Sequence, residues 1–406
     1  MPNRTIQKLF LAYKPALDKT PQPLKYRKAI QALSQCRTRD MGVSYYSCPE
    51  GHEDWEQFHS CRHRSCYLCA QKKRVEWVEQ QQQRLLNTPH FHVIFTLPHE
   101  YLSLWRYNET LFTRILFKAS QQSLMELMAD AKYGGVTPGL LMTLHTWGRQ
   151  LNLHPHTHCL VTAGGLTKAN GWQDSGTFLL PSAVLRRYYR GKIQAFLKEA
   201  MEAGDLVLPP DMSKADFWQQ YRGLYRKEWS VRIEERYAHG KGVMLYLARY
   251  CKGGPLNPEQ IKGWSQGQIE MSYLDHRSKR IRRQQLRPLQ LIQRLLQHVP
   301  TDGIHTVRYY GLYAPAAKQK YEQALSWHGN LAGLSVRRGL DVRTMLLCCK
   351  TCGTPAQLQG RVWRHAPKGN SFINSRPELG ASGTVQPGDA PYTASVLHSD
   401  LAALPP

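Results

Sequence analysis

The stretch LLMTLHTWGRQLNLHPHTHCLVTAGG, Leu140 to Gly165, contains two strand-like apolar runs and four histidines. The first run is LLMTLHTWG and the second is HTHCLVTAGG, and the polar segment RQLNLHP between them lets the two strands lie side by side. Alternate side chains of a strand project from one face, so His154, His156 and His158 share a side. The sequence therefore predicts neighbouring strands that carry a row of imidazoles.

Three histidines at this spacing favour a set of metal ligands over a solvated polar face. His145 lies eleven residues before His156 and reaches the same cation if the two strands pair. We expect His145 rather than His154 as the third ligand, because His154 precedes Pro155 and is placed in the connector. The predicted divalent-cation site is thus His145, His156 and His158, and imidazole ligands suit Mn²⁺ and Zn²⁺ by their softness.

Strand-like and helical patterns also follow one another outside this stretch, which predicts an α+β fold. We expect a strand at His90–Pro98, one or two helices over Tyr101–Lys132, mostly helix between Ala183 and Tyr237, and a hairpin of Gln268–Leu274 with Lys279–Leu286, followed by a helix after Pro288. Past about Val362 the composition turns to Pro, Gly, Ser and Ala, which is typical of a disordered tail.

Five cysteines crowd into the first seventy residues of a chain without an export signal, so metal ligation is expected rather than disulfide formation. The predicted tetrahedral Zn²⁺ site uses Cys48, His52, Cys66 and Cys69. The residues Cys36, Cys61 and His59 lie close enough in sequence to replace one of these ligands or to help form a second site, so the ligand set stays open. For LLCCKTCG, with Cys348, Cys349 and Cys352, we expect a remnant or a buried turn, because no second cysteine pair follows.

Two tyrosines lie four residues apart in KGVMLYLARYCK, a short predicted helix that ends at GGP. Tyr246 and Tyr250 therefore share one helix face. Such a pair usually serves packing, but beside a bound cation a phenol becomes able to attack a phosphate, because the cation lowers the charge cost. The two tyrosines are thus candidate nucleophiles for DNA transesterification.

The chain of 406 residues has 54 Lys plus Arg against 30 Asp plus Glu, a net charge of +24, which indicates a polyanionic partner. The basic stretch from Asp275 to Arg294 predicts phosphate contacts. Its candidate DNA-binding residues are Arg277, Lys279, Arg280, Arg282 and Arg283. No run is long and apolar enough to span a membrane, so we expect no membrane partner and a cytoplasmic, nucleoid-associated bacterial protein.

Taken together, these residues resemble the HUH superfamily of single-strand nucleases, and specifically the rolling-circle transposases of the insertion sequence 91 family. The resemblance covers about Cys36 to Tyr313. It rests on five blocks: HSCRHRSCYLCAQKK (His59–Lys73), FHVIFTLPHE (Phe91–Glu100), LHTWGRQLNLHPHTHCLVTAGGL (Leu144–Leu166), YLARYCKGGPL (Tyr246–Leu256) and HVPTDGIHTVRYYGLY (His298–Tyr313).

The resemblance implies an HUH nuclease domain with a central antiparallel sheet flanked by helices, preceded by a small zinc-binding domain. It implies that His156 and His158 hold Mg²⁺ or Mn²⁺, and that Tyr246 and Tyr250 each form a 5′-phosphotyrosine. The third histidine, His145, has the spacing found in conjugative relaxases of the superfamily. Thr157 departs from the usual hydrophobic residue of the His-x-His motif, but its side chain should face away from the metal.

Four segments are expected from the sequence and the resemblance together: residues 1–75 as a zinc-binding DNA-recognition domain, 85–315 as the two-tyrosine nuclease, 316–363 as a helical, cysteine-containing extension, and 364–406 as the tail. The expected function is transposition through single-stranded DNA of the element ends and target DNA. The alternatives are a plasmid replication initiator or relaxase with the same chemistry, and a zinc-dependent DNA-binding regulator without catalysis. The oligomeric state cannot be derived from the sequence.

Overall fold

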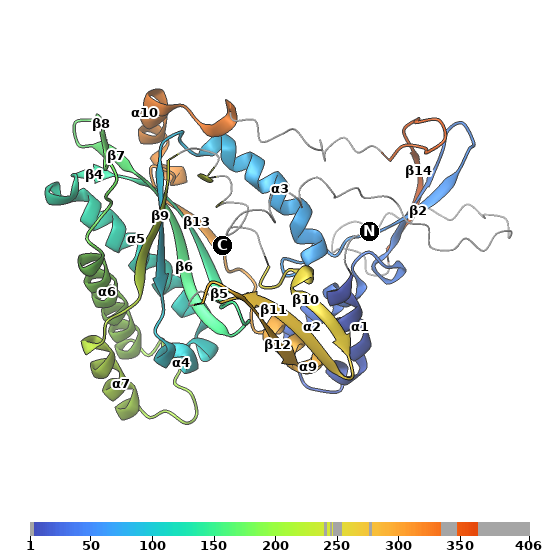
Figure 1. The fold of residues 1–406 in the computed structure, drawn as a ribbon, viewed down its shortest axis with the longest axis horizontal. Helices are drawn as coiled ribbons and strands as arrows, with labels where there is room; N and C mark the ends of the chain where they lie inside the picture. The colour runs from blue at the N-terminus through green and yellow to red at the C-terminus, as the bar shows by residue number, and fades with distance from the viewer. Residues whose placement is uncertain are drawn as a thin grey trace. The chain divides into compact units, whose positions relative to one another are not determined.

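The structure is a computed structural model that describes residues 4–238, 242–243, 246, 254–275, 278–333 and 347–363 (Figure 1). The chain forms two compact units. Of the described residues, the first unit comprises 4–73, 254–275, 278–299 and 347–363, and the second comprises 74–238, 242–243, 246 and 300–333. The segment 85–315, expected as one nuclease domain, is therefore divided, because residues 254–299 pack with the amino-terminal residues. The expected tail, 364–406, lies outside the described residues.

A five-stranded antiparallel sheet organises the second unit. Its strands, in spatial order, are β13 (Val307–Gly311), β5 (Gly139–Trp147), β6 (Leu153–Thr162), β3 (His90–Thr96) and β9 (Val231–Tyr237). The predicted pairing of the two histidine-bearing runs is confirmed, since β5 and β6 are neighbours with His145 opposite His156. The α+β class is confirmed as well.

Helices cover one face of this sheet and form its main hydrophobic core (Figure 1). The helices on this face are α4 (Leu102–Tyr107), α5 (Glu109–Ala129), α6 (Ser182–Glu202) and α7 (Lys214–Arg226). Strand side chains such as Phe95, Met142 and Cys159 are fully buried against them. Thr157, from the middle of the His-x-His motif, points to this side, where its hydroxyl lies 3.1 Å from that of Ser120. The expected orientation of Thr157, away from the histidines, is thus confirmed.

The opposite face carries the histidines beside a second, smaller hydrophobic cluster. Its fully buried members include Leu141 of β5 and Leu160 of β6, whose positions in the register share a side with His145 and His158. Partly buried residues of α3 (Tyr67–Arg84) and α10 (Lys318–His328) pack against this cluster. A three-stranded sheet of β4 (Val136–Thr137), β7 (Gly164–Thr167) and β8 (Trp172–Asp174) completes the unit.

Of the two helical segments predicted for the second unit, the first forms helices and the second ends in a strand. The segment Tyr101–Lys132 forms two helices, which meet at Asn108, whose side chain amide donates to the carbonyls of Leu104 and Val207. The expectation of helix up to Tyr237 is wrong at its end, where β9 forms. In that strand Val231 and Ile233 alternate with exposed charged residues and pack on the main core, a period of two that suits an edge strand beside β3.

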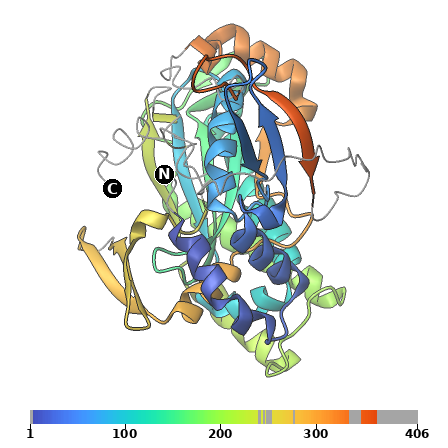
Figure 2. The ribbon, with the colours of Figure 1, turned by 90° about the vertical axis from the view of Figure 1, so that its right-hand side faces the viewer.

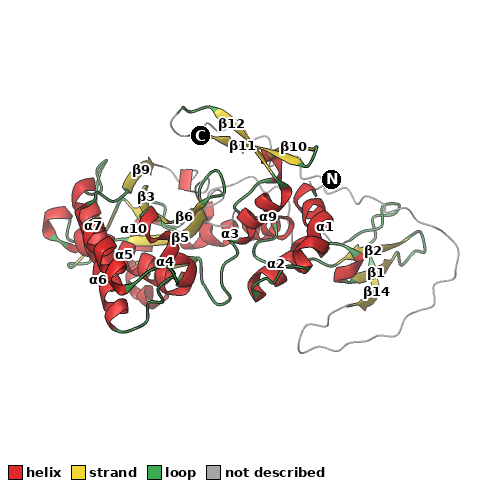
Figure 3. Ribbon diagram, turned by 90° about the horizontal axis from the view of Figure 1, so that it is seen from below, coloured by secondary structure: helices red, strands yellow, loops and turns green. Residues whose placement is uncertain are grey.

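The first unit combines helices with two small antiparallel sheets (Figures 2 and 3). Its helices are α1 (Thr5–Asp18), α2 (Leu24–Gln35) and α9 (Pro288–Leu296). The predicted hairpin is confirmed as β11 (Gln268–Leu274) with β12 (Ile281–Leu286), and β10 (Ile261–Ser265) lies beside it. The other sheet has the order β14 (Gln357–Val362), β1 (Val43–Ser47), β2 (Asp54–Phe58), so it joins segments from opposite ends of the chain. Among the described residues, no helix is long and apolar enough to span a bilayer.

Replacing Tyr313 by phenylalanine should destabilise the second unit by about 1–3 kcal/mol. His90 Nδ1 donates to the Thr88 carbonyl at 2.7 Å, so its bare Nε2 accepts the Tyr313 hydroxyl, also at 2.7 Å. The same hydroxyl accepts the backbone N–H of Leu86. The variant leaves two buried groups unsatisfied. Urea unfolding measures the loss, Tyr107→Phe at an exposed tyrosine is the control, and an unchanged free energy of unfolding would contradict this account.

Candidate active site and metal centres

The structure gathers the three predicted histidine ligands on one face of the central sheet. His145 comes from β5, and His156 and His158 come from β6. Their nearest ring nitrogens all lie within 4.8 Å of one another, and His156 Nε2 is 3.0 Å from His158 Nε2. The antiparallel register explains this, because directly opposed residues share a side.

Two features prepare these imidazoles for a cation. His156 Nδ1 lies 2.7 Å from the His154 carbonyl, which only accepts, so Nδ1 carries the proton and the Nε2 lone pair is free to ligate. Burial lowers the pKa of His156 and His158 well below the ordinary value, which keeps both rings neutral at pH 7. Two nitrogens each about 2.1 Å from a cation and at a right angle are about 3 Å apart, so the pair fits a divalent ion.

The sequence suggested that His154 lies in the connector, but the structure places it elsewhere. It belongs to β6, which begins at Leu153, and Pro155 is accommodated within the strand. The His154 ring is tilted beside that of His99, with centroids 5.6 Å apart. Its carbonyl orients His156, while its own ring is outside the group of three. His154 thus contributes through its backbone.

A fourth histidine, His92 of β3, was missed by the sequence analysis as a functional residue. His92 Nε2 lies 2.8 Å from His158 Nδ1, and its side chain is buried. The register accounts for the contact: Ile94 opposes His158, so His92, two residues earlier, shares the histidine face. The sequence signal was HFHV, His90 to Val93, in which histidine and apolar residues alternate at the start of the strand-like run.

The candidate nucleophile Tyr246 lies beside this fourth histidine. The Tyr246 ring meets that of His92 edge to face, with centroids 4.9 Å apart, and lies 5.9 Å from that of Tyr237. Only 1% of Tyr246 is exposed. A contiguous row therefore leads from Tyr246 through His92 to His158. The second candidate, Tyr250, lies outside the described residues.

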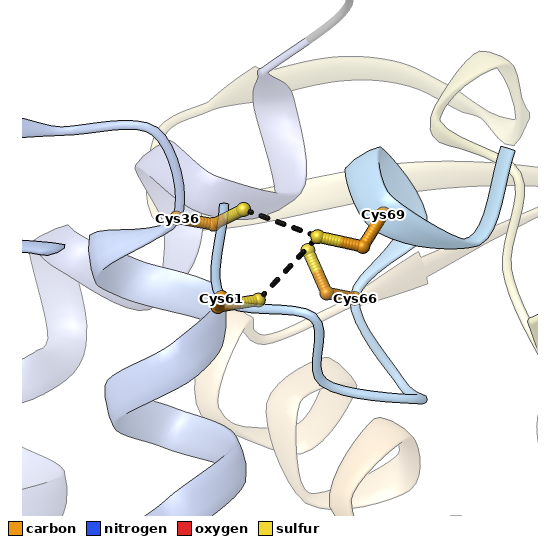
Figure 4. Close-up of side chains that lie close together, drawn as sticks. All are labelled: Cys36, Cys61, Cys66 and Cys69. Carbon is orange, nitrogen blue, oxygen red and sulfur yellow. Dashed lines mark hydrogen bonds between the residues drawn. The ribbon is translucent and has the colours of Figure 1, made fainter. Parts of the chain in front are cut away.

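A four-cysteine cluster lies in the first unit (Figure 4). The side chains of Cys36, Cys61, Cys66 and Cys69 turn toward one another, from the end of α2, the loop between β2 and α3, and the first turn of α3. The Sγ of Cys69 is 3.6 Å from that of Cys36 and 3.7 Å from that of Cys61. Sulfur atoms that bind one tetrahedral zinc ion at about 2.3 Å are about 3.8 Å apart, so the cluster fits Zn²⁺.

The four thiols of this cluster are hydrogen-bonded to one another, and these bonds raise the pKa of some of the thiols and lower that of others. The pKa of Cys61 is raised mainly by the hydrogen bond between Cys61 and Cys36. A hydrogen bond with Cys36 is also the main cause that raises the pKa of Cys66. The bond from Cys36 also lowers the pKa of the Cys69 thiol. Because zinc binds thiolates, a bound ion displaces these protons, and zinc affinity must fall in acid.

The zinc set expected first, Cys48 and His52 with Cys66 and Cys69, is divided in the structure. Cys66 and Cys69 are completed by Cys36 and Cys61, both of which the sequence analysis had left open. The reason is topological: the β1–β2 hairpin carries Cys48 and His52 to its far turn, whereas Cys36 follows α2 directly. His59 is not a ligand in either group; its Nε2 lies 2.8 Å from the Ser44 hydroxyl.

Cys349 and Cys352 join Cys48 and His52 instead, in a second group of four donors within 4.8 Å of one another. The segment LLCCKTCG does form a turn with Cys349 buried, as expected, but the structure also gives Cys349 and Cys352 a second pair of potential ligands, which the sequence did not predict. The missing second pair is present, but it lies near the other end of the chain. The Cys-x₂-Cys spacing itself was the available signal.

The basic hairpin contains the expected DNA-binding residues, except that Arg277 lies outside the described residues. Lys279 and Arg280 are exposed at the turn before β12. Arg282 Nε is 3.1 Å from Asp275 and Arg283 Nη1 is 3.3 Å from Glu270, so both have acidic partners. Of the expected DNA-binding residues, Lys279 and Arg280 are therefore the most available for phosphate contacts.

Similar proteins are transposases. Residues 7–97 match the family described as "Transposase zinc-binding domain", and residues 139–321 match the one described as "Putative transposase". A relative from Sinorhizobium fredii, "Putative transposase y4qJ", is 31% identical over 76% of this chain and 79% of its own length. The "Transposase for insertion sequence element IS801" of Pseudomonas savastanoi pv. phaseolicola is 28% identical over 71% of this chain and 70% of its own length. No solved structure matches the chain.

The two matched regions contain the features built up above from the residues. The zinc-binding match includes the complete Cys36, Cys61, Cys66 and Cys69 cluster, and the transposase match includes the β5–β6 histidines and Tyr246. The chain belongs to the insertion sequence 91 family of transposases.

Proposed function

We propose that this transposase cleaves and rejoins single-stranded DNA at the ends of its element by tyrosine transesterification, in a rolling-circle mode. The nucleophile is Tyr246, whose placement the structure describes. The residues His145, His156 and His158 hold a divalent cation, Mg²⁺ or Mn²⁺. The observation that carries the proposal is the row of rings from Tyr246 through His92 to His158 on one face of the sheet.

The reaction exchanges one phosphate ester for another. Tyr246 Oη attacks the phosphorus, the bond from phosphorus to the 3′ oxygen breaks, the phenol proton passes to solvent and the leaving 3′ oxygen takes up a proton. The products are a 5′-phosphotyrosine and a free 3′-OH. When bound, the cation polarises the phosphoryl oxygen and lowers the charge cost of attack. Because an ester bond is conserved, the 3′-OH of a second strand can reverse the step without a nucleotide cofactor.

The chain's own residues prepare this step. Neutral, buried imidazoles keep their lone pairs available, since the His154 carbonyl orients His156 and His92 contacts His158. Tyr246 is covered by its neighbours, so a phosphate reaches the phenol only after these side chains move apart. Burial thereby protects the nucleophile until DNA is bound. Tyr250, four residues further along the chain, would attack a second strand while the first remains attached.

Phosphate contacts outside the nuclease site come from the basic hairpin. Lys279 and Arg280 are exposed, and the chain's charge of +24 favours a nucleic-acid partner over any neutral ligand. Arg282 and Arg283 contribute less, because each is held by a carboxylate. Arg277 stays part of the expectation from the sequence.

The test is to incubate the purified chain with labelled single-stranded oligonucleotides of the element ends, in the presence of Mg²⁺ or Mn²⁺. We expect a covalent protein–DNA adduct that resists denaturation and requires the added cation. The matched variant is His156→Ala with His158→Ala, which removes two donors from the site. An adduct that forms equally in this variant, or equally after removal of divalent ions, would contradict the proposal.

His92 is proposed as a positioning residue that acts through His158. Its Nε2 is placed to accept Nδ1–H of His158, which directs the His158 Nε2 lone pair to the cation. His92→Leu should weaken the apparent affinity for Mg²⁺ by about 10–100-fold, as is typical for an outer-shell partner. His92→Gln, which keeps an acceptor, should lose less.

The measurement is the rate of oligonucleotide cleavage against Mg²⁺ concentration. If His92 only positions His158, the Leu variant recovers most of its rate at high Mg²⁺. A Leu variant with the wild-type dependence on Mg²⁺ would show that His92 has no role at the cation site.

A further inference from the structure

Two pairs of potential ligands from opposite ends of the chain converge beside the three-stranded sheet of the first unit. Cys48 and His52 flank the turn that follows β1, and Cys349 and Cys352 flank a turn that precedes β14. The Sγ of Cys48 is 3.5 Å from His52 Nδ1 and 3.6 Å from the Sγ of Cys352. All four donor atoms lie within 4.8 Å of one another.

The sheet register brings these pairs together. Ser47, the last residue of β1, pairs with Asp54 at the start of β2 and with Gln357 at the start of β14. Cys48 therefore leaves β1 at the same edge at which β14 begins. The convergence follows from antiparallel pairing on both sides of β1, with one register shift between Tyr45 and Tyr46 on the β14 side.

Each turn is closed by a glycine N–H, three residues after Cys48 in the first turn and four residues after Cys349 in the second. Gly51 N–H donates to the Cys48 carbonyl and Gly353 N–H donates to the Cys349 carbonyl, both at 2.9 Å. Each glycine has φ +72°, the left-handed region that glycine adopts without strain. The N–H of Thr351 also donates to the Cys349 Sγ at 3.4 Å, which orients this sulfur.

We propose that Cys48, His52, Cys349 and Cys352 bind a second structural zinc ion, which fastens β14 to the β1–β2 hairpin. Three sulfurs and one imidazole are a usual donor set for closed, tetrahedral zinc. For such a site, bond lengths of about 2.3 Å for sulfur and about 2.0 Å for nitrogen place neighbouring donors about 3.5–3.8 Å apart, which agrees with the two contacts above. Cys349 and Cys352 lie outside both regions that match transposase families.

The outer strand of this sheet, β14, buries little apolar surface. The side chains of β14 are exposed or half-buried, with Leu358 40% and Val362 53% exposed. Cys48 and Cys352 are 304 positions apart, so pairing β14 with β1 closes a long loop at a cost in chain entropy. A three-stranded sheet with few buried apolar side chains does not offset that cost by itself. A metal bond across the two turns does.

Zinc binding at this site requires no oxidant, reductant or other co-reactant. The thiols of Cys48, Cys349 and Cys352 release their protons to solvent, His52 binds as the neutral ring, and zinc undergoes no redox change. The Cys349 thiol donates to Glu53 Oε1 at 3.3 Å before it is deprotonated. Glu53 still accepts the backbone N–H of Lys350 afterwards, so its carboxylate keeps a partner.

The test is the zinc content of the purified full chain, measured by elemental mass spectrometry per mole of protein. The variant Cys349→Ser with Cys352→Ser should hold one zinc equivalent fewer than wild type, because one closed site is lost. Cys348→Ser is the matched control, since the neighbouring Cys348 is exposed and outside the group; it should retain the wild-type content. Equal zinc content in the double variant and in wild type would overturn the proposal.

A pair of variants at His52 separates ligation from folding. His52→Cys replaces one zinc donor by another and should keep the wild-type zinc content, whereas His52→Ala should lose the equivalent that the double serine variant loses. Limited trypsin digestion gives the structural readout: Arg361, within β14, should be cut faster in the Ala variant than in the Cys variant. Loss of zinc in both, or in neither, would contradict His52 as a ligand.

Discussion

Replacing both Tyr246 and Tyr250 by phenylalanine should abolish the covalent protein–DNA adduct and reduce strand cleavage to below about one-thousandth of the wild-type rate. Without a phenolic oxygen there is no atom that can form the phosphotyrosine ester, while the ring and its packing are retained. Tyr246 loses only its hydroxyl from its place beside His92, so the fold should be preserved. The measurement is the labelled adduct on a denaturing gel.

The control for this variant is Tyr237→Phe. Tyr237 belongs to β9, and its ring lies 5.9 Å from that of Tyr246, so it removes a phenol from the same surroundings. The control should retain adduct formation. A double Phe variant that still forms the adduct at the wild-type level would remove the tyrosine mechanism, and unchanged transposition in that variant would favour a regulator without catalysis.

Replacing Cys66 by serine should unfold the helices of the first unit while the second unit stays folded. Cys66 is fully buried within the four-cysteine cluster that joins α2 to α3. Structural zinc contributes about 10–16 kcal/mol in small zinc-binding peptides. This is comparable to the whole net stability of a typical domain, about 5–15 kcal/mol. The second unit has a large hydrophobic core of its own and should not depend on the metal.

Hydrogen exchange followed by mass spectrometry measures this effect region by region. Amides of α1 and α2 should lose about 100-fold or more of their protection, and amides of β5 and β6 should be unchanged. Cys348→Ser again serves as the control for a cysteine outside the clusters. If α1 and α2 kept their protection in Cys66→Ser, the cluster would not be a structural zinc site.

The local features of the fold could be predicted from the sequence because they depend on short periods. The alternation in HPHTH placed His156 and His158 on one face, and the short connector made β5 and β6 neighbours, as the structure confirms. The hairpin of β11 and β12 followed from its two strand-like runs and the turn between them. These features involve residues close in sequence, where turn chemistry and side-chain alternation decide the outcome.

Features that depend on distant pairing could not be predicted in the same way. The VRIEERY run becomes a strand because it pairs with the edge of β3. His92 contacts His158 because β3 pairs with β6 on the side away from β5. The potential metal ligands are grouped differently in the structure than the sequence predicted, because Cys349 and Cys352 reach Cys48 only through the β14–β1 register. Spacing along one segment gives no information about such partners.

The most direct test of the central claim is to identify the residue that becomes joined to DNA. Trypsin separates the two candidates, since Tyr246 lies in GVMLYLAR, Gly242 to Arg249, and Tyr250 lies in YCK, Tyr250 to Lys252. After reaction with an element-end oligonucleotide and Mg²⁺, nuclease and trypsin digestion followed by mass spectrometry should find a nucleotide on the tyrosine of one of these peptides. A nucleotide attached only to a residue elsewhere in the chain would contradict the account.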